Sequence, residues 1–454
     1  MRQPASTLVF IALLFASLPF AARFTTAADL VGDATADDTA AIQSLIDRKT
    51  GAITFPPGVY RLTKTVTIDL DNVGWVSLSG EGVAQFRMEG QGPAFRFVGT
   101  HAGTASPATV KANVWDRQRT PMVDGIEILG AHPEACGIEA DGTMQLTLTR
   151  VVVRKAKHAI RLTGRNRNVT LSECHLYENS GVGVFLDQLN LHQINIANCH
   201  ISYNAGGGVV AIASEIRNLQ IGTCDIEGNM GDANSDPTAN VLLDSTGTSV
   251  GEVAIVGCTI QHTHDAPGSA NIRINGWSDE RPFTDERRTG NITIADNVLS
   301  DVQTNLDLQG VRGITITGNT MWKGYANNVV AKNCTHLVMT GNLYDRSPRY
   351  HYGDGAMAKL GVTIEDCSDV TITGEHFGGN VIEHPAVLQL RRCDGVNVSG
   401  CTFSSIDQAG ILVDEVKFGQ ISGCLFTGVT AESVQVSGMS TSDVEFNANR
   451  FRRR

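Results

Sequence analysis

The sequence writes one short pattern three times in succession: 291-NITIADNVLS-300, 313-GITITGNTMW-322 and 336-HLVMTGNLY-344. Each copy has an alternating apolar run, a small residue, an asparagine and further apolar residues. The asparagines Asn297, Asn319 and Asn342 are 22 and 23 residues apart. A fixed period in the twenties is typical of a solenoid, in which each repeat is one stacked unit. The stretch therefore predicts a β array rather than several separate globular domains.

The asparagine position can be followed along most of the chain. One residue type at one position in successive coils indicates side chains that stack at the strand spacing. The predicted residues at this ladder position are Ala131, Val151, Cys174, Cys199, Cys224, Cys258, Asn297, Asn319, Asn342, Glu375, Cys401, Cys424 and Asn449. A second ladder position, eight residues earlier in its coil, holds Cys334, Cys367 and Cys393.

The ten cysteines are predicted to be buried thiols. Neighbouring parallel strands lie about 4.8 Å apart, whereas the Cβ atoms of a disulfide prefer a separation of about 3.8 Å. A free cysteine behaves as a small buried hydrophobe and fits a packing ladder. Disulfides between neighbouring coils stay open as the alternative, because secreted chains often use their cysteines in this way.

The chain has 454 residues, with 42% hydrophobic residues, 18% charged residues and a formal net charge of −11. This acidic balance argues against nucleic acid as a partner. Residues 1–28 resemble a secretory signal peptide, with Arg2 before an apolar run and small residues at its end. We therefore expect a secreted protein, extracellular or periplasmic, without a membrane span. The expected single domain covers residues 29–454, and its oligomeric state is left open.

A short helix is expected near the start of the mature chain. Thr35 and Asp38 have the spacing of a capping box. Apolar residues then recur at helical spacing from Ala41 to Ile46. A short amphipathic helix before a β array suits a cap over its first coil, so residues 29–51 are predicted to form an N-terminal cap.

The passages GDATADDTAAIQ (32–43) and ITFPPGVYRLTKTVTI (53–68), with LSGEG at 78–82, resemble the N-terminal signature of the pectate-lyase-like right-handed parallel β-helix superfamily. The resemblance implies an all-β, single-stranded right-handed parallel β-helix of about a dozen coils. It also implies that sugar binds on the second strand of each coil, the strand that follows the turn after the ladder residue. The superfamily includes lyases, hydrolases, epimerases and phage tailspikes. Its GHG, RIK and WIDH motifs are absent from this sequence, so the resemblance assigns no substrate.

In the strands after the ladder turns, every other residue is expected to point into the core. The outward partners are the candidate site residues Asp244, Arg273, Asn275, Asp307, Gln309, Lys332, Glu365 and Arg391. Insertions at 276–290 and 343–360 leave or enter these coils, and long loops on a compact scaffold are usually functional. The rings expected to contact substrate there or nearby are those of Trp277, Trp322, Tyr325, Tyr350, His351 and Tyr352.

A polysaccharide lyase acting by β-elimination fits these residue types. In such a lyase a base removes the proton beside a uronate carboxylate, and a cation neutralises the developing charge. The neutralising candidates are Arg273, Lys332 and Arg391, and the candidate bases are Tyr350, His351 and a deprotonated Lys332. Asp244 and Asp307 suit Ca²⁺, which prefers oxygen ligands.

An inverting glycoside hydrolase is the alternative enzyme, because it needs two carboxyl groups about 6.5–9.5 Å apart. Asp244 and Asp307 lie two coils apart, as do Asp307 and Glu365, which gives roughly 9.6 Å at the strand spacing. A non-catalytic carbohydrate-binding or surface-adhesion protein is the third possibility. A phage-tailspike-like adhesin is disfavoured by the signal peptide.

Two further groups rank lower as candidate sites. The first lies on the N-terminal coils beside an insertion at 99–120 and contains Arg96, Glu139, Asp141, Arg161 and Asp187. The second is the sequence HTHD at 262–265, which has no third metal ligand at a regular spacing. We therefore assign no metal ligands with certainty from the sequence, and Ca²⁺ at Asp244 and Asp307 stays possible.

Overall fold

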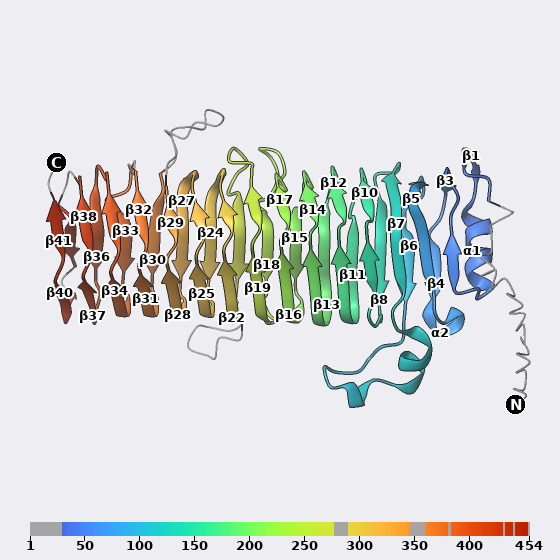
Figure 1. Cartoon of the computed structure of the whole chain (residues 1–454), viewed down its shortest axis with the longest axis horizontal. Coiled ribbons are helices and arrows are strands. Elements are labelled where there is room, and N and C mark those ends of the chain that lie inside the picture. The colour runs from blue at the N-terminus through green and yellow to red at the C-terminus, as the bar shows by residue number, and fades with distance from the viewer. Residues whose placement is uncertain are drawn as a thin grey trace, which may run out of the picture.

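The computed structural model (Figure 1) is an elongated stack of β coils. It describes residues 30–276, 289–345, 359–379, 383–429, 432–438 and 441–452. The predicted signal peptide therefore lies outside the described residues. Consecutive coils pair in parallel through three sheets, here called A, B and C, which confirms the predicted parallel β-helix. No helix in the described part of the chain is long and apolar enough to cross a membrane.

The chain visits the three sheets in a fixed order, from B to C to A in each coil. Sheet A contains β4 (Val66–Asp69), β6 (Gly92–Val98), β8 (Ala135–Asp141), the first parts of β11 (Ile160–Ser172) and β13 (Val182–Ala197), β15 (Gly207–Ile212), β18 (Ala239–Asp244), β21 (Ala270–Asn275), β24 (Val302–Gln309), β27 (Gly324–Lys332), β30 (Gly361–Glu365), β33 (Ala386–Arg391), β36 (Ala409–Asp414) and β39 (Val434–Ser437).

Sheet B continues around the corner from sheet A. It contains β2 (Ala52–Thr54), the first parts of β5 (Ser77–Met88) and β7 (Met122–Gly130), β9 (Thr147–Thr149), the second parts of β11 and β13, β16 (Glu215–Gly222), β19 (Val250–Val256), β22 (Gly290–Ala295), β25 (Arg312–Thr317), β28 (Thr335–Thr340), β31 (Ser368–Thr373), β34 (Asp394–Ser399), β37 (Gly419–Ser422) and β40 (Val444–Asn447).

Sheet C has the shortest strands. It contains β1 (Asp33–Asp37), β3 (Gly58–Leu62), the second parts of β5 and β7, β10 (Val152–Arg154), β12 (His175–Tyr177), β14 (His200–Ser202), β17 (Asp225–Glu227), β20 (Thr259–Gln261), β23 (Val298–Leu299), β26 (Thr320–Met321), β29 (Leu343–Tyr344), β32 (His376–Gly378), β35 (Thr402–Ser404), β38 (Leu425–Thr427) and β41 (Arg450–Arg452).

The inward residues form one continuous core along the axis. Ile272 and Ile274 of β21 are fully buried, and Leu306 and Leu308 of β24 lie opposite them in register. This confirms the alternation predicted for the sheet A strands. Burying each such side chain contributes roughly 1.5–3 kcal/mol.

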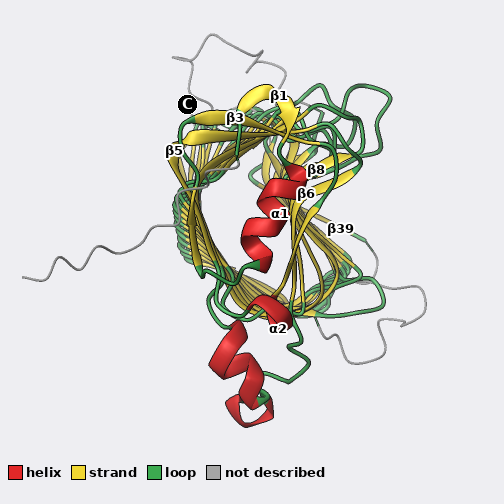
Figure 2. Ribbon diagram, turned by 90° about the vertical axis from the view of Figure 1, so that its right-hand side faces the viewer, coloured by secondary structure: helices red, strands yellow, loops and turns green. Residues whose placement is uncertain are grey.

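Helix α1 (Thr39–Asp47) lies across the N-terminal end of the cylinder (Figure 2). Its apolar face buries Ile42, Leu45 and Ile46, as the spacing predicted. The predicted capping box is wrong, because residues 33–37 form strand β1 and the Asp38 side chain accepts instead from the amides of Val31 and Gly32. A second short helix, α2 (Leu70–Val73), lies at the corner after β4.

The ladder position exists because a turn leaves a backbone N–H without a partner in its own coil. The amide of Asn297 donates to Asn319 Oδ1 at 3.0 Å, and the amide of Asn319 donates to Asn342 Oδ1 at 2.9 Å. A cysteine sulfur can be the acceptor instead, since the amide of Cys224 donates to Cys258 Sγ at 3.4 Å. Both asparagine and cysteine occur at this position because each offers an acceptor to the backbone amide of the coil before it.

One predicted ladder residue is wrong. Ala131 is exposed, and strand pairing aligns Val151 with Ile126, which is buried. Ile126 follows Gly125, which bends the corner of β7 with a φ of 60° as Arg150 does with 51° in the next coil, so this coil keeps the usual period and the prediction chose the wrong residue within it.

A second asparagine ladder, missed in the sequence, crosses the corner between sheets C and A. Its side-chain amides form a chain of hydrogen bonds of 2.7–2.9 Å, and every member is buried. Its members are Asn179, Asn204, Asn229, Asn240, Asn271, Asn305 and Asn328. Such a ladder is stable only because each buried amide is satisfied by the next.

All ten cysteines lie in the described segments and all are free thiols. Nine are buried, and only Cys136 is partly exposed. The prediction of buried thiols is therefore confirmed in preference to inter-coil disulfides.

We predict that Asn319→Ala destabilises the fold by about 1–3 kcal/mol, because it leaves the buried amide of Asn297 without an acceptor. The measurement is the change in chemical-denaturation midpoint. The exposed Asn447 on β40 provides the control, and Asn447→Ala should change stability by less than about 0.5 kcal/mol. Equal effects of the two substitutions would contradict this explanation of the ladder.

The buried Glu375 continues the first ladder after Asn342 and makes stability depend on pH. Burial raises the pKa of Glu375 from 4.5 to about 7. The folded protein thus keeps a proton that the unfolded chain releases, and stability falls as pH rises from 4.5 to about 7.

Glu375→Gln should remove this fall and stabilise the protein at pH 8 by up to about 3 kcal/mol, since glutamine keeps an acceptor for Asn342. Thermal unfolding midpoints between pH 5 and pH 8 provide the measurement. Glu445→Gln, at an exposed site on β40, should leave the pH dependence unchanged. A wild-type profile that is flat over this range would contradict the assignment.

Candidate functional site

The outer face of sheet A carries the predicted polar stripe. All eight predicted residues lie on outward positions of β18, β21, β24, β27, β30 and β33. Strand register divides them into two columns. The longer column contains Asp244, Asn275, Gln309, Lys332, Glu365 and Arg391, and continues to Asp414. The shorter column pairs Arg273 with Asp307.

Arg273 and Asp307 satisfy each other within the protein. Arg273 Nε donates to Asp307 Oδ2 at 2.8 Å, and its terminal nitrogens donate to the carbonyls of Thr238 and Gly268. Asp244 accepts from the backbone of Thr246 at the end of its strand. These contacts hold the first coils of the stripe together and leave Arg273 few donors for a ligand.

The later coils carry more accessible cations. Lys332 Nζ lies 3.4 Å from Glu365 Oε2, and Glu365 also accepts from Arg392. Arg391 Nη1 lies 3.4 Å from Asp414 Oδ2. The Lys332 and Arg392 side chains remain 44% and 43% exposed, so both can still reach an anionic ligand. The column thus alternates cations and carboxylates at one-coil spacing.

The predicted aromatic residues fall into two groups. Trp277, Tyr350, His351 and Tyr352 lie outside the described residues. Tyr325 is buried at the start of β27, and its ring stacks on His264 at a centroid distance of 4.0 Å. Trp322 is half-buried and lies beneath the ammonium group of Lys323, 4.8 Å from its ring centre. Of the two described rings, Trp322 is more accessible than Tyr325.

The carboxylates named for hydrolysis stand in different columns. Asp244 and Asp307 are two coils apart and also two residues out of register, as are Asp307 and Glu365. Strand spacing then gives about 12 Å between their backbone positions, beyond the inverting range of about 6.5–9.5 Å. Glu365 and Asp414 share a column two coils apart, or roughly 9.6 Å. Asp307 accepts from Arg273 at 2.8 Å, which would compete with a Ca²⁺ ion there, and Ca²⁺ binding by Asp244 and Asp307 stays a prediction.

The N-terminal cluster on sheet A is a chain of ion pairs. Arg96 bonds Glu139 at 2.8 Å, and Arg161 bridges Glu139 and Asp187 at 2.8 and 2.6 Å. The insertion that follows β6 contains the short helices η1 (Pro107–Thr109) and η2 (Val114–Gln118). Its backbone is tied to the second part of β11 by Arg167, which donates to the carbonyls of Thr104 and Ala105. Because these side chains pair with one another, the cluster links neighbouring coils, and its charged groups are less available to a ligand.

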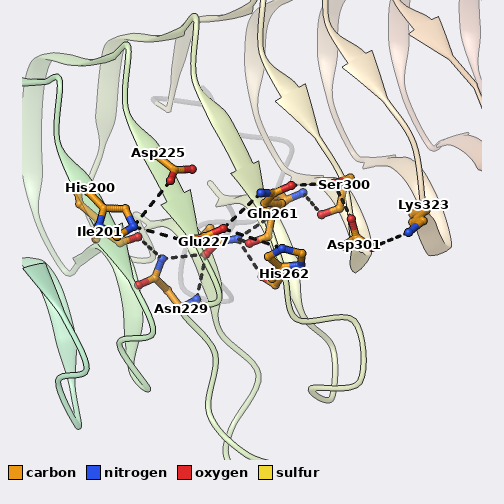
Figure 3. A network of polar contacts seen from close by, with 12 residues as sticks. His200, Ile201, Asp225, Glu227, Asn229, Gln261, His262, Ser300, Asp301 and Lys323 are labelled. Carbon is orange, nitrogen blue, oxygen red and sulfur yellow. Dashed lines mark hydrogen bonds and ion pairs between the residues drawn. The ribbon is translucent and has the colours of Figure 1, made fainter. Parts of the chain in front are cut away.

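A further polar cluster, on sheet C, was not predicted from the sequence (Figure 3). It joins His200 of β14, Asp225 and Glu227 of β17, and His262 just after β20. Burial raises the pKa of Asp225, and the neighbouring Glu227 adds to the shift. His262 belongs to the HTHD sequence, but its partner Glu227 comes from the preceding coil. His200 and Asp225 are 25 residues apart, which is one repeat period, so the period could have placed them side by side on neighbouring coils.

Comparisons with known proteins agree with this architecture. A profile described as a right-handed β-helix region matches residues 114–260 and 241–453. Tailspike protein 3 of bacteriophage CBA120 is 14% identical, with a TM-score of 0.56 over 91% of this chain and 59% of that chain. The tailspike gp49 of Pseudomonas phage LKA1 is 11% identical, with a TM-score of 0.53 over 89% of this chain and 80% of that chain.

The Dettilon tailspike protein is 15% identical, with a TM-score of 0.51 over 93% of this chain and 68% of that chain. No curated protein sequence gives a significant match. The chain spans only 59% of the CBA120 tailspike. At these identities the likeness demonstrates the fold alone.

Proposed function

The chain belongs to the right-handed β-helix family, and on this fold we propose a secreted protein that binds and cleaves an acidic, uronate-containing polysaccharide by β-elimination. The proposed site is the outer face of sheet A between Gln309 and Arg391. Residues 1–28 would be the signal peptide that is removed on export.

One observation carries this proposal: Lys332 and Arg391 occupy one column of sheet A, two coils apart, with Arg392 beside them. The chain as a whole has a net charge of −11 and repels an anionic glycan, so such a substrate needs a local basic site. The exposed Lys332 and Arg392 side chains provide one. Both cations share the carboxylate of Glu365, which is 21% exposed, and Arg392 also pairs with Asp366, which is 41% exposed. Ion pairs at such solvent-accessible positions contribute little.

The chemistry uses these cations to stabilise charge. A base removes the proton on the carbon beside the uronate carboxylate, and the electron pair spreads onto that carboxylate. The pair then forms a C=C bond as the glycosidic C–O bond breaks and the leaving oxygen takes a proton. Lys332 and Arg391 would neutralise the carboxylate in the transition state. Tyr350 and His351 remain candidate bases outside the described residues, together with Lys332 in its neutral form.

An inverting hydrolase is the second candidate, favoured by one observation. Glu365 and Asp414 stand in one column two coils apart, which is roughly 9.6 Å and at the upper limit of the inverting separation of about 9.5 Å. Arg391 lies between them and bonds Asp414. This pairing makes Asp414 a less available base than an unpaired carboxylate.

We predict that the purified protein releases unsaturated, ultraviolet-absorbing products from at least one member of a panel of polyuronates, and none from neutral glycans. Lys332→Ala should lower kcat by at least about 100-fold, as expected when one charge-stabilising group is removed. Lys417→Ala, an exposed lysine between β36 and β37, is the matched control and should retain full activity.

Two other results would contradict the lyase. Reducing ends without ultraviolet absorbance would identify a hydrolase, and Glu365→Gln and Asp414→Asn would then test the second candidate. Binding to a glycan without turnover would identify a binding or adhesion protein. If Lys332→Ala retained full activity, the site would lie elsewhere, with the N-terminal Arg96–Asp187 cluster the next to test.

A further inference from the structure

The sheet C cluster gathers two imidazoles and two carboxylates from three successive coils. Asp225 and Glu227 both face outward, because Ile226 between them is fully buried. His200 lies directly opposite Asp225 in the strand register, and Gln261 lies opposite Glu227. His262 follows Gln261 at the end of β20. The repeat therefore brings His200, Asp225 and Glu227 together, with His262 on the other side of Glu227 (Figure 3).

The distances are close to those of ligands around one metal ion. His200 Nε2 lies 3.7 Å from Asp225 Oδ2 and 3.9 Å from Glu227 Oε1. One ligand atom from each of the three residues lies within 4.8 Å of the others. A tetrahedral metal with bonds of about 2.1 Å holds its ligands roughly 3.4 Å apart. The two distances from His200 would shorten by about half an ångström, and the separation of the two carboxylates by up to about 1.4 Å, to complete such a site.

Neighbouring residues orient the proposed ligands. Gln261 Nε2 donates to Glu227 Oε2 at 3.2 Å, and Ser300 Oγ donates to Gln261 Oε1 at 3.4 Å. His262 Nε2 lies 3.9 Å from the same Glu227 oxygen. Metal-ligating carboxylates are typically held by hydrogen bonds of this kind. Glu227 is therefore fixed from one side and presents its other oxygen to His200.

An independent sign of a missing ligand comes from Ser202. Its side chain is buried, and its hydroxyl has no hydrogen-bond partner in the described part of the chain. Strand register places it opposite Glu227. Buried hydroxyl groups are normally satisfied, but among the described residues the Ser202 hydroxyl lacks a partner on the coil that faces Glu227.

We propose that His200, Asp225 and Glu227 bind a divalent transition metal of the Zn²⁺ class. Mixed imidazole and carboxylate donors suit Zn²⁺, whereas Ca²⁺ takes oxygen ligands alone. The His200 and Asp225 side chains are 36% and 47% exposed, so the ion would keep a position open to solvent. This site is on sheet C, apart from the glycan stripe on sheet A, and the two proposals stand independently.

The test is isothermal titration of Zn²⁺ into the folded protein, residues 29–454, after removal of any affinity tag. We expect one Zn²⁺ per chain and little heat from Ca²⁺. His200→Ala and Asp225→Asn should each weaken Zn²⁺ binding by at least about tenfold, a loss seen even when residues that only orient ligands are changed. X-ray absorption of the Zn²⁺ complex should show nitrogen as well as oxygen ligands.

The matched control is His376→Ala, because His376 on β32 occupies the same outward column of sheet C, between Leu343 and Thr402. It should leave Zn²⁺ affinity within about twofold. Asp225→Asn preserves side-chain size, so a lost affinity with an unchanged unfolding midpoint reports the site and not the fold. Absence of Zn²⁺ binding to the wild type, or equal binding by all three variants, would overturn the proposal.

Discussion

The parallel hydrogen bonding between successive coils, about 4.8 Å apart, is the constraint on which the rest of this structure depends. At that spacing, equivalent side chains stack directly on one another. Tyr344, Phe377, Phe403, Phe426 and Phe451 form a column of near-parallel rings whose centroids are 4.7–5.0 Å apart. The same spacing lets an asparagine or thiol in one coil accept from the backbone amide of the coil before it, so the turns are satisfied by their neighbours.

Side chains also stack from coil to coil on the outer faces, where they bring polar and charged groups together. A residue type placed once per coil becomes a column, so Lys332, Glu365 and Arg391 form an alternating charge row on sheet A. On sheet C, the register brings His200 against Asp225 although 25 residues separate them. Each candidate site thus consists of a few polar residues that interrupt an otherwise regular outward column of the β-helix. The core can stay unchanged while the outer columns vary, because inward and outward residues alternate.

Local patterns in the sequence were sufficient for the fold and for which side chains face outward. The alternation around Ile272 and Leu306 predicted the burial of both, and the recurring Asn297 position predicted stacking. Prediction failed where the chain leaves the period. The second asparagine ladder passes from Asn229 to Asn240 within one coil, across an inserted loop. Prediction also failed at Ala131, where the apolar Ile126, within the period, occupies the ladder position instead. Pairing between coils depends on side-chain reach, which no local pattern contains.

We propose that the outer face of sheet A binds an acidic polysaccharide through the cations Lys332 and Arg391. A crystal structure of the protein with a uronate oligosaccharide tests this directly. We expect a sugar chain along the axis of the β-helix, with carboxylates within hydrogen-bonding distance of Lys332 and Arg391. A sugar bound to the Arg96–Asp187 cluster, or to sheet B or C with the Lys332 column empty, would contradict it.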